Sequence, residues 1–487
     1  MNHLYLGDCL NVLRDNVKDE SIDLIYIDPP FNSKRNYNVF FDDKEIQTQR
    51  VAFEDTWSLK NIGDSLLELH TVPNEKLYNL LRVYQEAAPH VFPYLVMMSL
   101  RILELHRVLK STGSFYLHCD PTASHYLKTV LDLIFGVKNF RNEIIWHYSG
   151  WNAKLKSSFS SRHDIILFYT KQTKPNFNSF AIGWESEEEY IKLRRQKVRQ
   201  DENGKKYVLS DAGGGKRVKR FLDEAMSYGK PVDDVWNLDK INNSSKEALG
   251  YPTQKPKSLL ERVIQANSNE GDIILDAFCG CGTTVDAAES LKRQWIGIDI
   301  SSIAINVIKH RLKDSYKKEL TPFEIRGVPS DEASAIQLWE HNPFAFEDWW
   351  LTEFDVFATT FGKKGADKGI DGIGMYAIPK ADDPIKAAFQ VKGGKVQSKD
   401  IDALLGAMTK QKCELGVLLT RNTPTKPMLE TVVQVGYFEI AGFTYPKLQM
   451  MTLAEFFKGK QLMLPKDNIT FKRAKTLGKR TDQKGLF

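Results

Sequence analysis

The sequence is poor in cysteine and has no long apolar run. Its 487 residues include only five cysteines, an odd number scattered along the chain, which favours a reducing compartment over a disulfide framework. It has no run of about eighteen uninterrupted apolar residues, so no membrane-spanning helix is expected. The first residues lack a basic segment before their apolar stretch, so no signal peptide is expected. We therefore predict a cytoplasmic protein without membrane contact.

Other absences narrow the function classes. The chain has no G-x-x-x-x-G-K-[ST] loop, so ATP-driven translocation would need a further subunit. It shows no internal repeat of fixed period, which disfavours a solenoid. Cys279 and Cys281 have metal-like spacing but no second Cys or His pair nearby, so zinc is the weaker interpretation. A net charge of +5 is too small to identify a polyanionic partner by itself.

The length exceeds that of one hydrophobic core, so we expect more than one domain. The apolar pattern loosens in the segment 322–342, before an aromatic-rich helix opens at Phe344. We predict a first domain over residues 1–320, a linker over 321–342, a second domain over 343–460 and a basic tail over 461–487. The tail contains seven basic and two acidic residues between Lys466 and Lys484.

Short aliphatic segments alternate with helical patterns in the first domain. We predict strands over Ile22–Ile27 and over residues 114–117, 273–275 and 295–298. Such alternation is typical of a parallel sheet covered by helices, which is an α/β fold.

A basic segment lies inside this α/β pattern. Eleven Lys or Arg residues and three Asp or Glu residues occur between Lys192 and Arg220, around three consecutive glycines. The segment predicts an exposed basic insert, and a solvated charged helix over residues 186–199 is the equally weighted alternative.

A glycine-bearing turn follows the strand 273–275. Gly280 and Gly282 would let the backbone approach a ligand closely, and Asp299 ends the next strand, fifteen residues beyond Thr284. A carboxylate there can accept hydrogen bonds from the ribose hydroxyls of an adenosine. Position 285 is Val285, where a dinucleotide fingerprint has glycine or alanine. A ligand without phosphate, such as S-adenosylmethionine, therefore fits better.

The strand Ile22–Ile27 runs directly into Asp28-Pro29-Pro30-Phe31. Two prolines stiffen this loop and leave the Pro29 carbonyl free to accept a hydrogen bond. Asp28 would be a second acceptor for an exocyclic amino group, and Phe31 could stack on a base flipped from a duplex. The tetrapeptide is equally compatible with an ordinary proline-rich strand end.

Along the chain, Asp28–Phe31 comes before the glycine-bearing turn, and in this order the motifs resemble those of β-class DNA amino-methyltransferases of the adenine-N6, DPPF type. The resemblance covers about residues 1–315 and includes the segments 142–146, 163–169 and 251–256. It implies a Rossmann-like fold with an inserted target-recognition region over residues 150–250, which binds double-stranded DNA. It also implies that S-adenosylmethionine is bound by Asp8, Thr253, Lys255, Asp276, Phe278, Gly280, Gly282, Thr283 and Asp299.

The second domain resembles the Mrr-like branch of the PD-(D/E)xK restriction endonucleases, a smaller α/β fold. Asp371 follows a glycine-rich turn, and Gln390 and Lys392 stand in a later strand, where Gln replaces the usual acid. The resemblance implies a Mg²⁺ site at Asp371, Gln390 and the Val391 carbonyl, with Lys392 stabilising the attacking water or the phosphorane-like charge. Glu347 would be an acid presented from the preceding helix. The replacement of an acid by Gln390 removes one negative charge from the predicted metal site.

These motifs indicate one chain that methylates and cuts DNA within a restriction–modification system. Two alternatives stay open: a second domain that only binds DNA or senses its modification, and methylation of cytosine N4 or of RNA. The recognised sequence, a homodimer and a further subunit of the restriction system also stay open.

Overall fold

The computed structural model describes most of the chain. The described residues are 1–30, 36–43, 46–54, 63–72, 74–150, 157–172, 174–184, 186–211, 213–242, 245, 247–249, 251, 253–358, 369–381 and 383–470.

A nine-stranded sheet forms the centre of the N-terminal unit, in the order β13-β6-β7-β5-β2-β14-β15-β1-β16. Its strands are β1 (Asn2–Leu6), β2 (Ile22–Ile27), β5 (Leu109–Cys119), β6 (Phe140–His147), β7 (His163–Thr170), β13 (Val235–Asn237), β14 (Ile273–Asp276), β15 (Gln294–Asp299) and β16 (Phe323–Arg326). Strand β7 runs antiparallel to both of its neighbours, and the other pairs are parallel.

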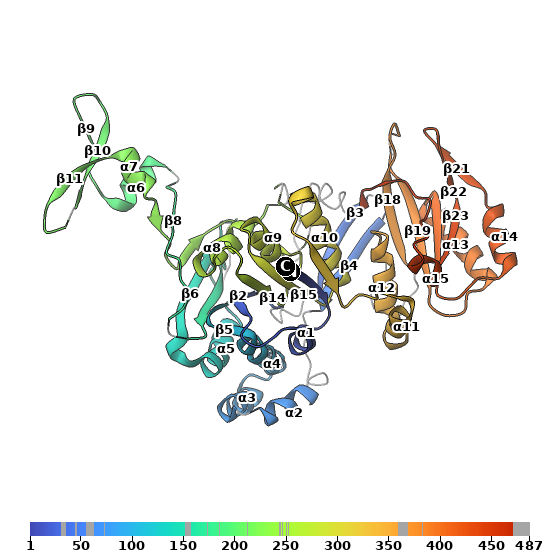
Figure 1. Cartoon of the computed structure of the whole chain (residues 1–487), viewed down its shortest axis with the longest axis horizontal. Coiled ribbons are helices and arrows are strands. Elements are labelled where there is room, and N and C mark those ends of the chain that lie inside the picture. Colours follow the sequence, from blue (N-terminus) through green and yellow to red (C-terminus); the bar gives the residue numbers. More distant parts are fainter. Residues whose placement is uncertain are drawn as a thin grey trace.

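Helices cover both faces of this sheet, as Figure 1 shows. One face packs against α1 (Cys9–Asn16), α3 (Glu75–Ala87), α4 (Phe92–Val108) and α5 (Ser124–Leu131). The other packs against α8 (Lys257–Asn267), α9 (Thr283–Ser290) and α10 (Ser302–Tyr316). The chain also forms β3 (Asn36–Asp43), β4 (Ile46–Glu54), α2 (Gly63–Thr71) and short turns at Asp132–Gly136, Val137–Asn139 and Lys317–Glu319.

The structure confirms the four predicted strands, which lie within β2, β5, β14 and β15. The expectation of a wholly parallel sheet was wrong at β7. No helix is described between β6 and β7, and without such a crossover a strand returns antiparallel to its neighbour.

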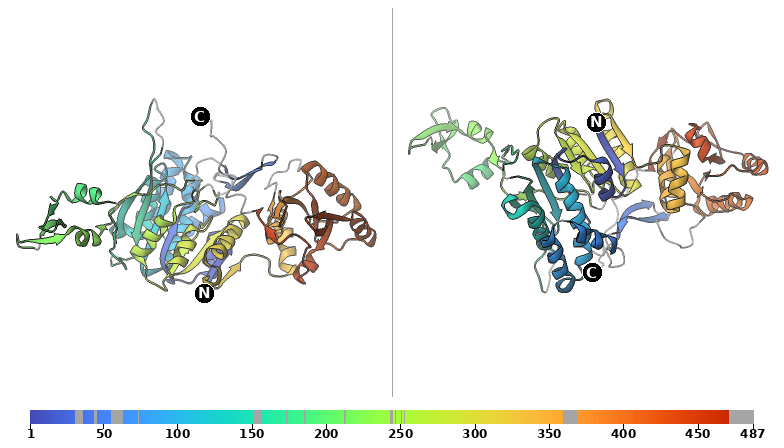
Figure 2. Two further views of the ribbon diagram at one scale, coloured as in Figure 1. Left: turned by 90° about the horizontal axis from the view of Figure 1, so that it is seen from above. Right: turned by 60° about the horizontal axis from the view of Figure 1, so that its bottom comes forward.

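The basic insert is a folded arm over residues 181–231. It contains β8 (Ala181–Ile182), α6 (Glu187–Arg194), β9 (Arg199–Gln200), β10 (Lys206–Asp211), β11 (Arg217–Phe221), α7 (Leu222–Ser227) and β12 (Lys230–Pro231). A small core of Tyr190, Val208, Leu222 and Ala225 holds it together. The predicted helix over residues 186–199 ends early, at Arg194, and the chain continues into a three-stranded sheet. Figure 2 shows the arm projecting from the end of the sheet opposite the C-terminal unit.

The C-terminal unit is a second, smaller α/β structure. Its sheet contains β17 (Phe357–Ala358), β18 (Gly372–Ala377), β19 (Ile385–Lys392), β20 (Leu415–Thr420), β23 (Leu448–Thr452) and β24 (Asp467–Asn468). The surrounding elements are α11 (Glu332–His341), α12 (Pro343–Glu353), α13 (Ser398–Gln411), α14 (Lys426–Gln434), β21 (Tyr437–Ile440), β22 (Phe443–Pro446) and α15 (Leu453–Phe457).

Two predicted boundaries need correction. The segment 321–342, expected to be a linker, contains β16, which pairs with β1, and α11, which packs in the C-terminal core. The first part of the predicted tail also packs, because β24 pairs with β18 and Thr470 bonds to Met375. Both segments bury apolar or backbone groups that the loose sequence pattern did not reveal. Residues 471–487 lie outside the described residues.

Among the helices in the described ranges, none is both long and apolar enough to cross a membrane.

Candidate functional site

Asp28-Pro29-Pro30 follows β2 at the carboxyl edge of the nine-stranded sheet. Strand β2 lies between β14 and β5, with Leu24 opposite Ile274 and Ile27 opposite Leu117. Because parallel strands end at the same edge, the turn after β14 lies beside this loop. Phe31, the predicted stacking residue, lies outside the described residues.

The carboxylate of Asp28 is held by a residue far along the chain. Its Oδ2 accepts from the Lys255 ammonium group, and the two side chains are only 16% and 12% exposed. Its Oδ1 is buried and has no hydrogen-bond partner among the described residues. A buried acceptor without a donor costs free energy until a ligand provides one. The site can therefore receive an N–H group at Asp28.

The glycine-bearing turn is shaped by a second carboxylate. Asp276 accepts from the Phe278 backbone N–H at 3.0 Å and from the Thr284 hydroxyl at 2.5 Å. Burial raises the pKa of the Asp276 carboxyl to about 7. Both oxygens thus help to fold the turn, each with a further lone pair left, and cofactor contact by Asp276 stays a prediction.

Gly282 is required by packing as well as by backbone conformation. Its φ is +74°, and a Cβ at this position would lie 2.5 Å from Cγ1 of Ile308 on α10. Gly280 has a φ of +50°, but a Cβ there would meet only Tyr251, at 3.6 Å. The predicted close approach of ligand and backbone therefore concerns Gly280 more than Gly282.

Asp299 lies at the end of β15, beside the turn. Its Oδ2 accepts from the Gly280 N–H and its Oδ1 from the Ser301 N–H, each at 2.8 Å. Burial raises the pKa of the Asp299 carboxyl to about 6. Since each carboxylate oxygen has a further lone pair, the predicted acceptance of ribose hydroxyls is still compatible with these contacts.

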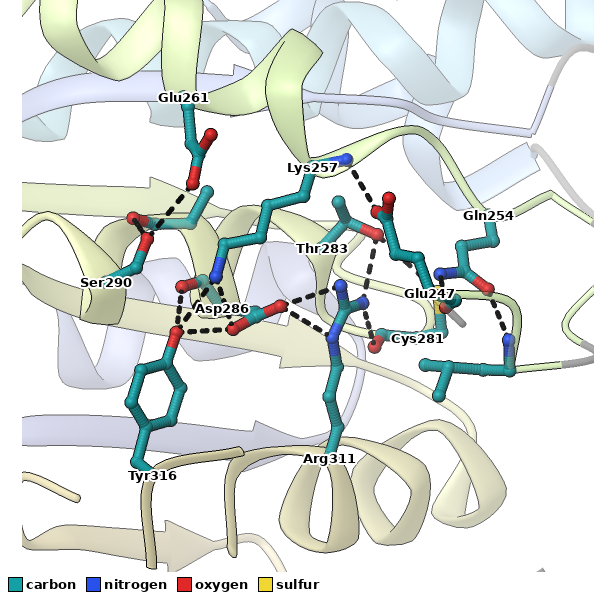
Figure 3. Close-up of polar contacts among 12 residues, drawn as sticks. Glu247, Gln254, Lys257, Glu261, Cys281, Thr283, Asp286, Ser290, Arg311 and Tyr316 are labelled. Carbon is teal, nitrogen blue, oxygen red and sulfur yellow. Dashed lines mark hydrogen bonds and ion pairs between the residues drawn. The ribbon is translucent and has the colours of Figure 1, made fainter. Parts of the chain in front are cut away.

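A buried network of polar and charged side chains contacts the turn and stabilises it (Figure 3). The sequence did not predict this network. Asp286 is 4% exposed and accepts from Lys257 at 3.0 Å, from Tyr316 and from Arg311 at 2.8 and 2.9 Å. Arg311 also donates to the Cys281 carbonyl at 3.2 Å and to the Thr283 hydroxyl at 3.1 Å. Charged residues on otherwise apolar helix faces, as in α9 and α10, are the signal that could have revealed it.

The other residues predicted to bind the cofactor occupy different positions in the structure. Asp8 caps α1 by accepting from the Leu10 N–H at 2.8 Å and pairs with Arg101 at 2.5 Å. Phe278 and Thr253 lie in the two loops that flank the site. Lys255 contacts the predicted catalytic residue Asp28, which the sequence did not suggest.

In the C-terminal unit, Asp371 and the strand β19 come together. The Asp371 N–H donates to the Phe389 carbonyl at 2.8 Å, and Asp371 Oδ2 accepts from the Val391 N–H at 2.7 Å. Gln390 is 5% exposed, and its Oε1 has no partner among the described residues. Lys392 follows two positions later, on the same face of β19.

Glu347 comes from a different element of the C-terminal unit. Glu347 lies on α12, which packs with Phe389 and Val391 on one face of β19. Gln390 and Lys392 alternate with that pair, and the Lys392 ammonium lies 3.7 Å from Asp400 on α13, on the other face. A role for Glu347 as an acid at this site stays a prediction.

Oxygen ligands suit Mg²⁺, and the buried Gln390 Oε1, which has no partner among the described residues, fits such an ion. Gln390 stands between Phe389 and Val391, the two residues of β19 whose backbone groups bond to Asp371. The described residues hold no group of three His, Cys, Asp or Glu side chains that could bind a metal by themselves. Water or substrate would have to complete the coordination of any Mg²⁺ ion.

The arm carries exposed cations of two kinds. Lys205, Lys206, Lys219 and Arg220 pair with carboxylates inside the arm. The remaining seven are exposed and have no ion pair among the described residues: Lys192, Arg194, Arg195, Lys197, Arg199, Lys216 and Arg217. These seven, which we call the open cations, lie at the end of α6, in β9 and in the turn before β11.

Comparison with known proteins agrees with this division. A family model described as DNA methylase matches residues 22–310, more than half of the chain. The chain belongs to the DNA methylase family. A second model, described as restriction endonuclease, matches residues 342–441, so this DNA methylase also carries a restriction-endonuclease domain.

Two curated relatives match the methylase part. The type II methyltransferase M.HpaI of Haemophilus parainfluenzae is 27% identical over 310 residues, which are 63% of this chain and 74% of that protein. The DNA adenine methyltransferase YhdJ of Escherichia coli K12 is 27% identical over 307 residues, 63% of this chain and 81% of that protein. The solved M1.HpyAVI–SAM complex aligns with 64% of this chain and 99% of its own, at 18% identity and a TM-score of 0.34.

Proposed function

We propose that this DNA methylase transfers a methyl group from S-adenosylmethionine to N6 of an adenine flipped out of double-stranded DNA. The observation that carries the proposal is the buried Oδ1 of Asp28, which has no partner among the described residues while Lys255 holds Oδ2. An adenine amino group has two N–H donors, so it can satisfy Oδ1 and the Pro29 carbonyl together.

The chain's own groups would act mainly by positioning. S-adenosylmethionine supplies an electrophilic methyl group when bound. Asp28 and the Pro29 carbonyl would orient the amino group so that its lone pair faces the turn at Gly280, and the rigid prolines would limit its motion. Asp28, as the acceptor of that amino group, would also be placed to take the proton that the group loses after transfer.

The residues at the turn support the choice of cofactor. Gly280 has a left-handed conformation with little around its Cβ position, and Asp299 bonds to its N–H. A neutral adenosine moiety with ribose hydroxyls fits this turn, which lacks the third glycine of a dinucleotide site.

Nucleoside analysis after labelled methyl transfer would test the proposal. We expect N6-methyladenine in duplex DNA from the wild-type protein and almost none from Asp28→Ala. Asp23→Asn is the matched control, because Asp23 lies on the same strand and pairs with Lys110 at 2.7 Å, at the far edge. Label in cytosine, or label only in RNA, would contradict the proposal.

We also propose that the open cations of the arm bind DNA phosphates around the target. Seven exposed cations that have no ion pair among the described residues favour a polyanion, whereas the four that pair with carboxylates stabilise the arm itself. Reversing Arg199 and Arg217 to Glu should weaken duplex binding and flatten its salt dependence. The same change at Lys205 should instead destabilise the arm.

A second activity is proposed for the restriction-endonuclease domain, namely Mg²⁺-dependent cleavage of DNA. The supporting observation is the buried Gln390 Oε1, which has no partner among the described residues and belongs to the residue between Phe389 and Val391, both bonded to Asp371. We expect nicking of unmethylated duplex that requires Mg²⁺ and disappears in Asp371→Ala and Lys392→Ala. Binding that is independent of Mg²⁺ and never leads to cleavage would favour a sensing module instead.

A further inference from the structure

The segment that returns from the arm is fastened along β6 as far as the catalytic edge. Strand β13 pairs with β6 in parallel, with Trp236 opposite Trp146. Beyond β13, the Leu238 carbonyl accepts from the Trp146 indole N–H at 2.7 Å, and Asp239 accepts from the Ser149 N–H at 3.0 Å. The segment therefore connects the arm directly to the next residue, Lys240, at the catalytic edge.

Lys240 is exposed, and its ammonium group lies over the ring of Tyr148, 3.7 Å from the ring centroid. The Tyr148 hydroxyl in turn donates to Asp164 Oδ1 at 3.1 Å. A cation over an aromatic face is attracted to the ring, so the Tyr148 ring is a defined resting place for this lysine.

Asp164 is the centre of a polar cluster on the catalytic edge. Its Oδ2 lies 3.3 Å from Nε2 of the buried His118, whose Nδ1 lies 2.7 Å from the Tyr26 hydroxyl. Tyr26 stands two positions before Asp28 on the same strand. The cluster thus joins β2, β5, β7 and the segment after β6 at the place where the target base would be held.

Two lysines and two carboxylates share this edge. Lys255 pairs with Asp28, and the charges of both Lys240 and Lys255 act on Asp164. If Lys240 leaves Tyr148, Asp164 loses one of the two lysine charges that act on it and attracts Lys255 more strongly. The hold of Lys255 on Asp28 then weakens, and the orientation of the Asp28 carboxylate is lost.

We propose that Lys240 is a positioning residue through which the recognition arm acts on the catalytic carboxylate Asp28. The inference rests on the proposed methyl transfer, because it assigns a role at that same site. In this structure Lys240 rests on Tyr148 and balances Asp164, so that Lys255 is kept on Asp28, and movement of the arm on DNA would act on this balance. Recognition and transfer are coupled by this charge balance.

The test uses the full chain and a duplex in which the base methylated by the wild type has been mapped. The variant is Lys240→Met, which keeps an apolar stem but no charge. The matched control is Arg262→Met, because Arg262 likewise lies over an aromatic ring, that of Trp236, at 5.2 Å. The readouts are the Kd for S-adenosylmethionine, the Kd for the duplex, the KM for the duplex and kcat.

We expect Lys240→Met to bind both ligands within about twofold of the wild type, while kcat falls about tenfold. Lys240→Arg should restore most of kcat, and Arg262→Met should leave it near the wild-type value. An unchanged kcat in Lys240→Met would overturn this inference but leave the proposed function standing. So would an equal loss in Arg262→Met, or a loss that only follows weaker cofactor binding. A wild type that methylates no base would overturn the proposed function and this inference together.

A second pair of variants tests the same cluster without altering charge. Tyr148→Phe removes the hydroxyl that bonds to Asp164, and Tyr169→Phe removes the equivalent bond to Asp132, of 2.7 Å, at the far end of β7. We expect a several-fold lower kcat only in Tyr148→Phe. Equal kcat values in the two variants would contradict a positioning role for the Asp164 cluster.

Discussion

The ammonium group of Lys255 is paired with the carboxylate of Asp28, although 227 positions separate the two residues in the sequence. The pair joins the loop after β2 to the segment just before α8. One carboxylate oxygen of Asp28 bonds to Lys255, and the other is available to a ligand.

Replacing Lys255 by Met should lower kcat for methyl transfer by about a hundredfold, because Asp28 loses the partner that orients it. The Kd for S-adenosylmethionine should change little if Lys255 serves Asp28 and not the cofactor. Isothermal titration and single-turnover kinetics would measure both quantities. Lys110→Met, which removes the partner of Asp23 on the same strand, is the control. A large loss of cofactor affinity would instead support the role first predicted for Lys255.

Binding of S-adenosylmethionine should weaken below about pH 6. The pKa of Asp299 is raised to about 6, so the carboxyl is protonated below that value and loses an acceptor for a ribose hydroxyl. The Kd measured at pH 5 should exceed that at pH 7.5 in the wild type. In Asp299→Asn, the Kd for S-adenosylmethionine should be higher than the wild-type value at pH 7.5 and nearly independent of pH. A wild-type Kd that is flat over this range would speak against ribose binding by Asp299.

Asp276 should make the unliganded protein less stable as the pH rises. Its pKa is about 7 in the folded state against an ordinary 3.8, so the folded chain binds more protons between these values. The stability contribution is therefore present at low pH and is lost as the pH rises towards 7. Thermal unfolding at pH 5 and pH 8 should show a smaller drop in Tm for Asp276→Asn than for the wild type.

Removing the Arg311 guanidinium should destabilise the methylase domain by about 3–5 kcal/mol, because it leaves Asp286 buried without its main cation. Lys257 and Tyr316 still contact Asp286, which places the expected loss toward the lower end. Thermal unfolding of Arg311→Met is the measurement. A Tm within about 1 °C of the wild type would show that the remaining partners suffice.

Alanine at positions 280 and 282 should have different costs. In Gly282→Ala, the left-handed φ is unfavourable for alanine and the new Cβ clashes with Ile308. We therefore expect the free energy of unfolding to fall by about 2–3 kcal/mol. In Gly280→Ala, only the backbone conformation is unfavourable, which should lower the free energy of unfolding by about 1 kcal/mol. This variant should weaken S-adenosylmethionine binding more than Gly282→Ala does. Unfolding and cofactor titration of both variants would separate packing from ligand approach. Equal effects on both quantities would contradict this assignment.

The strands and turns that carry the motifs were predictable because each depends on a local sequence pattern. Buried aliphatic runs such as Ile22–Ile27 predict strands, and a proline pair or a glycine turn after them predicts a binding edge. The family matches for residues 22–310 and 342–441 agree with the two resemblances drawn from those motifs.

Other features were missed because long-range contacts decide them. The direction of β7 depends on the connection that precedes it, and the segment 321–342 is ordered by its partners β1 and the C-terminal core. The helix α6 stops at Arg194 because the chain turns there into a small separate core around Tyr190.

The sequence by itself determined the two-domain α/β class, the strands that end in Asp28 and Asp276, and the motifs from which chemistry could be predicted. Only the tertiary structure decided that Lys255 serves Asp28, that Gly282 is needed by Ile308, and that Lys240 rests on Tyr148. The physical reason is distance along the chain. Hydrophobic period and turn chemistry act over a few residues, whereas ion pairs, packing and burial depend on segments that meet only when the chain has folded.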